Sequence, residues 1–259
     1  AHKNILGYTA DFIFERFGEQ APDFSNIFVL LPHKQVIRQF NDTLCHALPE
    51  DLPAIIPPWS GTLLDWTHQH CSSRHPQYLV ISEYARQLLF IEALQQHPDL
   101  FKEENKWQVT QSLLDLFDEL SLNQAGLFTS AEGWHEQLRQ AYGIEEQDFV
   151  HLQYESKLVY TLWHAWQTQL EENRLYDETA DYISRLSNAP ATSEGKFFIC
   201  LGLNDYTATE QEFINLLLSN QQCQLIEYGS TIAATECTEQ EHDFSAFICE
   251  TFAQSSSSI

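Results

Sequence analysis

Two stretches of this sequence are hydrophobic at every position, residues 27–31 (IFVLL) and residues 197–201 (FFICL). A strand with one face in water alternates apolar and polar residues, so an unbroken run indicates a strand that helices cover on both faces. A short turn and then a helical pattern follow each run. The sequence therefore predicts an α/β fold with a mainly parallel sheet, built from βα units.

Shorter runs are expected to complete the sheet. Ala54–Ile56 and Gln224–Tyr228 contain β-branched or aromatic residues and are predicted as strands, with Asn4–Tyr8 as a weaker fifth. Lys34–Leu48 follows the first run and places its apolar residues on one helical face. After the run at 197–201, Thr207 and Glu210 have the spacing of a capping box, which predicts the start of a helix there.

The middle of the chain has a different pattern. Residues 81–187 contain successive amphipathic segments, the longest at Phe149–Leu170, and no strand is predicted among them. The polar stretch Ser187–Lys196 is expected to be a hinge or loop. We therefore expect an α/β core from residues 1–80 and 188–235, an inserted all-helical lobe at 81–187, and the start of a following domain at 236–259.

The charge balance limits the classes of partner. There are 13 Lys and Arg residues against 37 Asp and Glu residues, and the formal net charge is -24. This charge opposes contact of the whole surface with a phosphate backbone, which argues against a free-standing DNA-binding module. No run of 18 apolar residues and no signal peptide is found, so no membrane partner and a cytoplasmic location are expected. Six cysteines without a C-x-x-C pair are expected to be reduced thiols.

The motifs that bind nucleotide phosphates are missing from the sequence. A P-loop needs G-x-x-x-x-G-K-[ST], yet the expected first βα turn, Gly7–Asp11, has one glycine and no lysine. Gly195-Lys196 precedes a predicted strand, so it lies on the wrong side of that element. Hydrolysis of ATP by this chain is therefore not expected, and no cofactor-binding residue is assigned.

Candidate metal and catalytic groups have simpler explanations. His68, His70, Cys71 and His75 form the densest metal-like cluster, but alternate residues of a helix face nearly opposite directions. We interpret the histidines as surface residues at a helix end. No nucleophile elbow occurs, and the acidic cluster Asp115, Asp118 and Glu119, like Glu145 and Glu146, is interpreted as solvated. No catalytic or metal-binding residue is assigned.

Two features could contact nucleic acid. Trp59 follows two prolines and is either a loop aromatic that stacks on a base or a packed side chain, whereas Trp163 and Trp166 lie in an apolar helical stripe and are predicted to be core. The segment Leu31–Gln35 leaves the carboxyl end of a strand, where open α/β sheets bind ligands. With Lys34 and Arg38 it forms a locally basic spot in an acidic chain.

The order and spacing of these pieces over most of the chain resemble one family. It is the AddB-type subunits of bacterial double-strand-break repair helicase–nucleases, in the branch whose first helicase domain lacks its ATPase motifs. The segments that carry the resemblance are FVLLPHK (28–34), IIPP (55–58), ISEYARQLL (81–89), LLDLFDEL (113–120), WHAWQTQLEENRLYD (163–177), FFICLGLN (197–204) and TATE (207–210).

The resemblance implies a P-loop-helicase-like domain with an inserted helical lobe and an inactivated P-loop. It also implies that a second helicase-like domain and a PD-(D/E)XK nuclease domain follow this chain. No cofactor is expected to bind within the chain itself. The residues that correspond to the family's element near single-stranded DNA are His33, Lys34 and Gln35. The implied partners are DNA, bound by the full-length protein, and a helicase–nuclease partner subunit. Whether the full-length protein is an exonuclease is left open.

Three functions remain in competition at this point. The first is a non-catalytic helicase-fold scaffold that helps to shape a DNA channel or holds a partner subunit. The alternative is an α/β small-ligand-binding protein or enzyme with its site at the carboxyl ends of the strands, near Pro32–Lys34 and Gly202–Asp205. The third is a protein-interaction module, which would expose a large apolar patch on the helical lobe.

Overall fold

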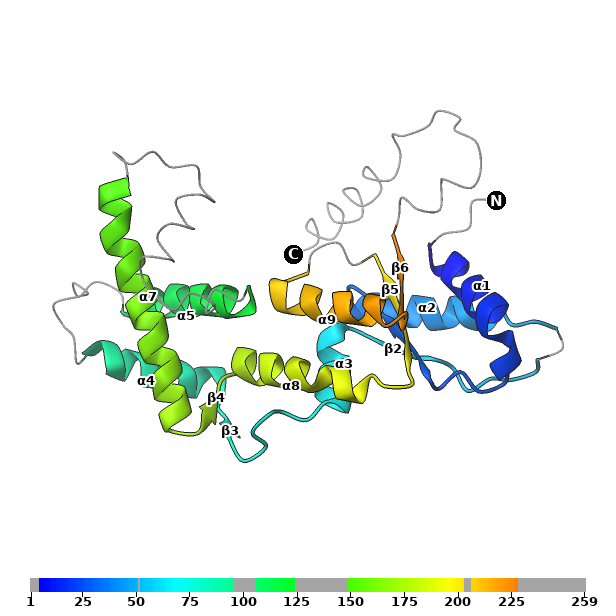
Figure 1. Ribbon diagram of the computed structural model, residues 1–259, viewed down its shortest axis with the longest axis horizontal. Coiled ribbons are helices and arrows are strands. Elements are labelled where there is room, and N and C mark those ends of the chain that lie inside the picture. Colours follow the sequence, from blue (N-terminus) through cyan, green and yellow to red (C-terminus); the bar gives the residue numbers. More distant parts are fainter. Residues whose placement is uncertain (1–4, 51, 96–105, 124–148, 203–205, 228–259) are drawn as a thin grey trace, which may run out of the picture.

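The computed structural model describes residues 5–50, 52–95, 106–123, 149–202 and 206–227, and its centre is a four-stranded parallel sheet (Figure 1). The strand order is β2-β1-β5-β6, and each neighbouring pair is parallel. The chain therefore has an α/β fold, as the unbroken apolar runs predicted. The four strands are β1 (Ile27–Leu30), β2 (Trp59–Gly61), β5 (Phe197–Leu201) and β6 (Cys223–Ile226).

Helices cover both faces of this sheet, which explains why β1 and β5 contain almost no polar residue. Ile27 and Val29 face a core that includes Phe40 and Leu44 of one helix and residues of the N-terminal helix. Phe28 belongs to the core on the opposite face. The helices on the first face are α1 (Ile5–Phe17) and α2 (Lys34–His46), and those on the second are α3 (Leu63–His70), α8 (Glu178–Thr192) and α9 (Ala208–Ser219).

Two of the predicted strands are wrong. Of Asn4–Tyr8, the described residues from Ile5 onward belong to α1, so Gly7–Asp11 is a helical segment and no βα turn. Ala54–Ile56 forms only an isolated bridge between Ile56 and Asp23. Prolines flank that segment on both sides and cannot donate to a sheet ladder.

On the side of β1 away from β5, the paired strand is β2, Trp59–Gly61, and not Ala54–Ile56. Its backbone lies opposite Phe28–Leu30, and its last residue must be glycine-sized, because a Cβ at Gly61 would collide with the ring of Trp59. The Trp59 ring lies against Phe28, with 5.9 Å between ring centroids, and its Nε1 donates a 3.0 Å hydrogen bond to Gln69. Of the two sequence interpretations of Trp59, the structure shows the packed side chain.

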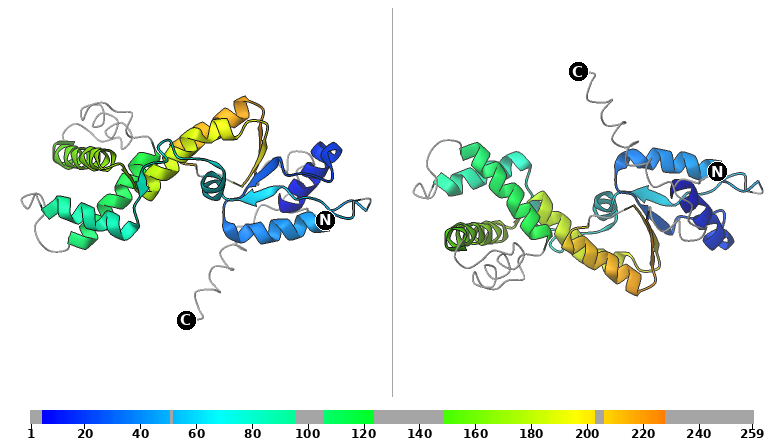
Figure 2. Two further views of the ribbon diagram at one scale, coloured as in Figure 1. Left: turned by 90° about the horizontal axis from the view of Figure 1, so that it is seen from below. Right: turned by 90° about the horizontal axis from the view of Figure 1, so that it is seen from above.

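The helical lobe has a core of its own, at the opposite end of the molecule from the N-terminal helices (Figure 2). It consists of α4 (Glu83–Gln95), α5 (Lys106–Leu122) and α7 (Phe149–Glu172). Trp163 and Trp166 are 1% and 3% exposed, so the prediction that they are core is confirmed. The prediction of no strand in residues 81–187 is wrong, because β4 (Leu175–Tyr176) pairs in parallel with β3 (Leu79–Val80).

The predicted hinge Ser187–Lys196 is also wrong over most of its length, because α8 continues to Thr192 with Pro190 inside it. Leu186 and Ala189 are buried against the sheet and hold this last turn in place, whereas Pro190 is exposed. A proline beyond the first turn of a helix removes one backbone hydrogen bond and crowds the carbonyl four residues earlier, so the burial of Leu186 and Ala189 must outweigh this cost. The other end of α8 lies against α5 and β4, so this helix joins the sheet to the lobe, and the expected boundary at 187/188 falls inside it (Figure 1).

Several expectations fall on residues that the structure does not describe. The predicted following domain at 236–259 and the pair Glu145 and Glu146 lie outside the described residues, as does Asp205 of the predicted ligand crevice. Cys45, Cys71, Cys200 and Cys223 are free thiols, while Cys237 and Cys249 lie beyond the described part. Within the described ranges no helix is long and apolar enough to cross a bilayer.

Candidate functional site

The strand order creates a crevice at the carboxyl edge of the sheet. From β1 the chain runs through α2 to β2 on one side, while β5 lies on the other side of β1 and is followed by α9 on the opposite face. The loops that follow β1 and β5 therefore diverge, which is the arrangement at which open α/β sheets bind ligands. A hollow of about 490 Å³ lies at this place, lined by residues 31–35 and 62–64 together with Tyr206 and Glu210.

The predicted DNA-contact residues His33, Lys34 and Gln35 all line this hollow and are exposed. His33 is the N-cap residue of α2, but its side chain makes no capping hydrogen bond. The first turn of α2 also contains no acidic residue. The backbone N–H groups at the start of α2 are thus left without a side-chain acceptor from their own cap, which is the arrangement that favours an anion at a helix N-terminus.

The cations of this region are paired with carboxylates. Lys34 Nζ lies 2.7 Å from Asp65 Oδ1, and Arg38 Nε lies 3.9 Å from Asp42 Oδ2. Burial opposes ionisation of Asp65, but the hydrogen bonds from Lys34 and Thr62 outweigh it and lower the pKa of Asp65. The net charge around Lys34 and Arg38 is therefore close to zero, and not positive as the sequence alone indicates.

The opposite wall of the hollow comes from the start of α9. The capping box predicted from sequence is confirmed, since Thr207 Oγ1 accepts from the backbone of Glu210 while Glu210 Oε2 accepts from the Thr207 backbone N–H. The other oxygen of Glu210 accepts a 2.6 Å hydrogen bond from the Tyr182 hydroxyl. Burial raises the pKa of Tyr206, with a further contribution from Cys200, so its hydroxyl remains protonated at the edge of the hollow.

The histidines and the cysteine of the metal-like cluster do not converge. His70, the last residue of α3, packs against aromatic rings, with centroids 5.4 Å from Phe28 and 5.6 Å from Trp59. His75 lies in the loop after α3 and stacks on Tyr78 instead. Across the described ranges, no group of three or more His, Cys, Asp or Glu residues is arranged to hold a metal ion.

The position of His70 leads to a prediction about pH. Burial, and then the nearby charge of Lys196, lower the pKa of His70 in the folded chain. The unfolded chain therefore binds more protons below about pH 6.5, and folding stability should fall as pH is lowered from there. His70→Gln is expected to flatten this part of the stability profile, measured by urea unfolding at several pH values. His68→Gln is the control, because His68 is also an exposed histidine of α3. An equal flattening in both variants would contradict the assignment to His70.

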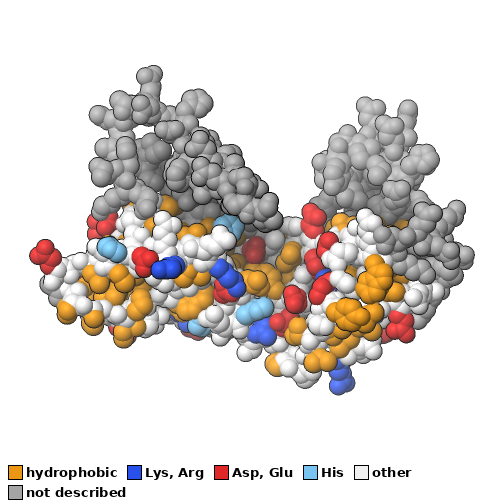
Figure 3. All heavy atoms as spheres, turned by 180° about the vertical axis from the view of Figure 1, so that it is seen from behind, with side chains coloured by type: hydrophobic (Ala, Val, Ile, Leu, Met, Phe, Trp, Pro, Cys, Tyr) orange, Lys and Arg blue, Asp and Glu red, His pale blue; other side chains and the backbone are white. Residues whose placement is uncertain are grey.

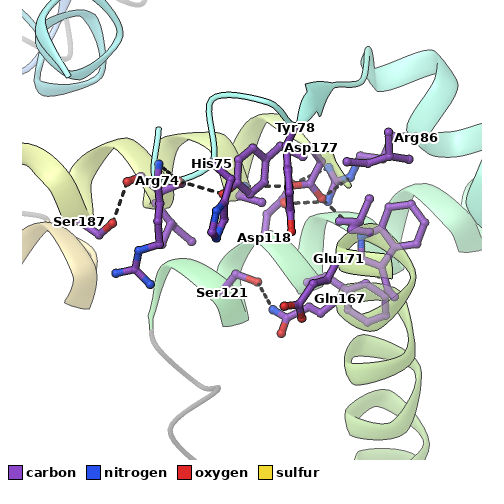
Figure 4. Close-up of a pocket in the computed structure, with 18 residues that line it drawn as sticks. Arg74, His75, Tyr78, Arg86, Asp118, Ser121, Gln167, Glu171, Asp177 and Ser187 are labelled. Atoms are coloured by element: carbon purple, nitrogen blue, oxygen red, sulfur yellow. Dashed lines mark hydrogen bonds and ion pairs between the residues drawn. The ribbon is translucent and has the colours of Figure 1, made fainter. Parts of the chain in front are cut away.

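A second pocket, of about 380 Å³, lies where the lobe meets α8 (Figure 4). Its inner wall contains Arg86, which the sequence analysis did not single out. The guanidinium donates to both oxygens of Asp118, at 2.6 and 2.9 Å, and its Nε lies 3.2 Å from Asp177 Oδ2. Asp118 was interpreted as solvated, and this is wrong, because it is part of a largely buried ion-pair network.

A sequence signal for this network did exist. Positions 86, 90 and 94 are spaced by four residues and all three side chains are buried, so Arg86 occupies the same stripe of α4 as Phe90 and Leu94. An arginine within an apolar stripe requires carboxylate or carbonyl partners, because a buried unpaired charge is very costly. The sequence does not reveal which carboxylates these are, since Asp118 and Asp177 come from other elements.

A scan against protein-family models and a search of curated proteins find no match to this sequence.

Proposed function

We propose that this chain is a non-catalytic helicase-fold scaffold of a DNA double-strand-break repair helicase–nuclease, and that the carboxyl edge of its sheet contacts single-stranded DNA. The observation that carries this proposal is the hollow at the point where the strand order reverses, with His33, Lys34 and Gln35 exposed on its rim. These are the residues that the resemblance to AddB-type subunits assigns to a DNA-proximal element. The nuclease chemistry belongs, in this proposal, to domains beyond this chain.

The rim groups suit a phosphate and a base. The start of α2 presents backbone N–H groups, and the side chain of Lys34 is 69% exposed. Exposed ion pairs contribute only about 0–1 kcal/mol, so Lys34 can exchange Asp65 for a phosphate oxygen at little cost. His33 and Gln35 supply hydrogen-bonding groups for a base or a sugar.

The charge of the chain sets the strength of this contact. A net charge of -24 repels nucleic acid at long range, so only a short stretch of backbone can be bound. For single strands, the slope of log K against log salt is about -0.7 for each phosphate neutralised. We expect weak binding by this chain with a slope that corresponds to one or two phosphates.

The test is binding of a labelled oligothymidylate of about 12 nucleotides at low and moderate salt, followed by fluorescence anisotropy. Lys34→Gln is expected to weaken binding severalfold at low salt and to reduce the slope by about 0.7. Lys196→Gln is the matched control, because Lys196 precedes β5 at the opposite edge of the sheet and lies over the ring of Phe28. Equal losses in the two variants, or no binding by the parent chain, would contradict the proposed contact.

A small-ligand site at the same hollow is the second candidate. The hollow has a volume within the range of about 300–1,000 Å³ found for small-molecule sites, and the hydroxyl-bearing residues Thr62 and Tyr206 line it. The two candidates differ in the same assay. If the hollow serves a small molecule and not DNA, the parent chain should bind no oligothymidylate in this assay.

The lobe carries exposed apolar side chains that favour its role as a surface for the partner subunit. Tyr84 and Leu88 are 66% and 42% exposed and lie one helical turn apart on α4, and Leu79 of β3 is 67% exposed. Hydrophobic side chains also gather at the lobe end of the face in Figure 3, at the right of the view. In the scaffold proposal these exposed apolar side chains hold the partner helicase–nuclease subunit. The scaffold and the protein-interaction module considered from sequence are then one function.

A further inference from the structure

The pocket between the lobe and α8 has an apolar and aromatic floor. Phe117, Trp166 and Leu170 are each less than 7% exposed and form its base. Tyr78 and Tyr176 also line the pocket, with ring centroids 5.0 Å apart. A pocket of about 380 Å³ with such a floor has the size and lining of a small-molecule site.

Carboxylates outnumber cations beside this pocket. Arg86 is the buried cation, and three carboxylates lie within 3.3 Å of it, those of Asp118, Asp177 and Glu83. Its side chain is only 5% exposed and its donors face these carboxylates, so it is not free to bind an anion from solvent. Glu83 does not line the pocket and is 44% exposed, but Asp118 and Asp177 both line it and outnumber Arg86. The inner wall therefore carries a net negative charge, and Asp177, at 6% exposed, is the least screened part of it.

The rim adds one further carboxylate on the side of α7. Glu171 extends beside Gln167, whose amide donates to Ser121 Oγ at 3.3 Å (Figure 4). No ion pair of Glu171 occurs within the described part of the chain. Arg74 lies across the pocket from Glu171, and both residues are exposed, so solvent screens these two opposite charges alike. The charge preference of the pocket therefore depends on the excess of carboxylates over Arg86 at the inner wall.

We propose that this pocket binds a small planar organic cation, such as an aromatic amidinium or guanidinium. The half-buried tyrosines Tyr78 and Tyr176 present rings that attract a cation through their quadrupole, and Glu171 with the carbonyl oxygen of Gln167 offers acceptors for its N–H groups. The walls come from both the lobe and α8, so an occupant contacts both parts of the molecule. This site is separate from the carboxyl edge of the sheet and does not depend on the function proposed for that edge.

The experiment compares three probes that share one ring and differ in charge: benzamidinium, benzamide and benzoate. Binding to the whole chain is followed by NMR shifts of the Trp166 indole N–H and by calorimetry. Benzamidinium is expected to bind and to shift the Trp166 signal, with benzamide weaker and benzoate weakest. Glu171→Gln is expected to weaken benzamidinium binding by about three- to fivefold. Glu172→Gln, the next residue on α7 and not part of the pocket, should leave it unchanged.

A filling variant separates loss of the pocket from loss of the fold. Ala180 lies in the first turn of α8 and lines the pocket, so Ala180→Leu is expected to abolish benzamidinium binding while the circular dichroism spectrum stays unchanged. Tighter binding of benzoate than of benzamidinium would overturn the proposed charge preference. Failure of all three probes to shift Trp166 at millimolar concentration would overturn the site itself, as would undiminished benzamidinium binding by folded Ala180→Leu.

Discussion

Replacement of Arg86 by methionine is expected to lower the free energy of unfolding by about 3–5 kcal/mol. The arginine side chain is 5% exposed and its partners Asp118 and Asp177 are 26% and 6% exposed, so the substitution leaves carboxylates that water reaches poorly without their counter-ion. It also removes a hydrogen bond to the backbone carbonyl of Leu114. The three elements that meet here, α4, α5 and the start of α8, lose their shared contact. Urea unfolding at neutral pH measures the change.

The matched control for this variant is Arg38→Met. Arg38 is 93% exposed and lies 3.9 Å from Asp42, and exposed pairs of this kind are worth about 0–1 kcal/mol. Adding Asp118→Asn to Arg86→Met should recover part of the lost stability, because it removes one of the uncompensated charges. A loss below about 1 kcal/mol for Arg86→Met would show that the network is not a structural support of the lobe.

Trp66→Ala is expected to cost about 3–5 kcal/mol, the range for removal of a buried tryptophan or phenylalanine side chain. Trp66 is 0% exposed and connects three elements, because its ring stacks on Phe213 of α9 with centroids 5.5 Å apart and meets Phe198 of β5 edge-on at 5.0 Å. The alanine variant leaves a cavity in the core under the sheet. Thermal and urea unfolding both report this loss.

Trp66→Phe should cost much less than Trp66→Ala. The indole Nε1 of Trp66 is buried and has no hydrogen-bond partner among the described residues, so phenylalanine removes an unsatisfied donor along with part of the volume. Trp107→Ala is the control for the loss of an indole, since Trp107 is 50% exposed at the start of α5. Similar losses for Trp66→Ala and Trp107→Ala would contradict the placement of Trp66 in the core.

The sheet could be predicted from the sequence wherever local pattern and burial agree. Phe197–Leu201 is apolar throughout because both faces of β5 are covered, and the helix after it begins at the capping box of Thr207 and Glu210. These signals are local, so they need no knowledge of the rest of the chain. The same holds for the place of the carboxyl-edge hollow, because it follows from strand direction and from the turn at Pro32-His33.

The parts that could not be predicted depend on distant contacts. Trp59–Gly61 is a strand because its backbone meets β1, although two prolines precede it, and α8 extends through Pro190 because Leu186 and Ala189 are buried against the sheet. The lobe pocket is assembled from α4, α5, α7, α8 and the segment around Tyr78. Its lining residues lie in three separate stretches of the sequence, 74–86, 117–121 and 166–187, so no short window contains the whole site.

Hydrogen exchange of backbone amides, measured with single-stranded oligothymidylate and separately with Mg-ATP, tests the proposed function most directly. The expected result is that the oligonucleotide slows exchange in residues 31–38 and 62–64, around the carboxyl-edge hollow, while Mg-ATP slows exchange nowhere in the sheet. Slowed exchange around the hollow with Mg-ATP would contradict the scaffold proposal and indicate a nucleotide site. Slowed exchange with the oligonucleotide only on the lobe would place the DNA contact elsewhere and remove His33, Lys34 and Gln35 from it.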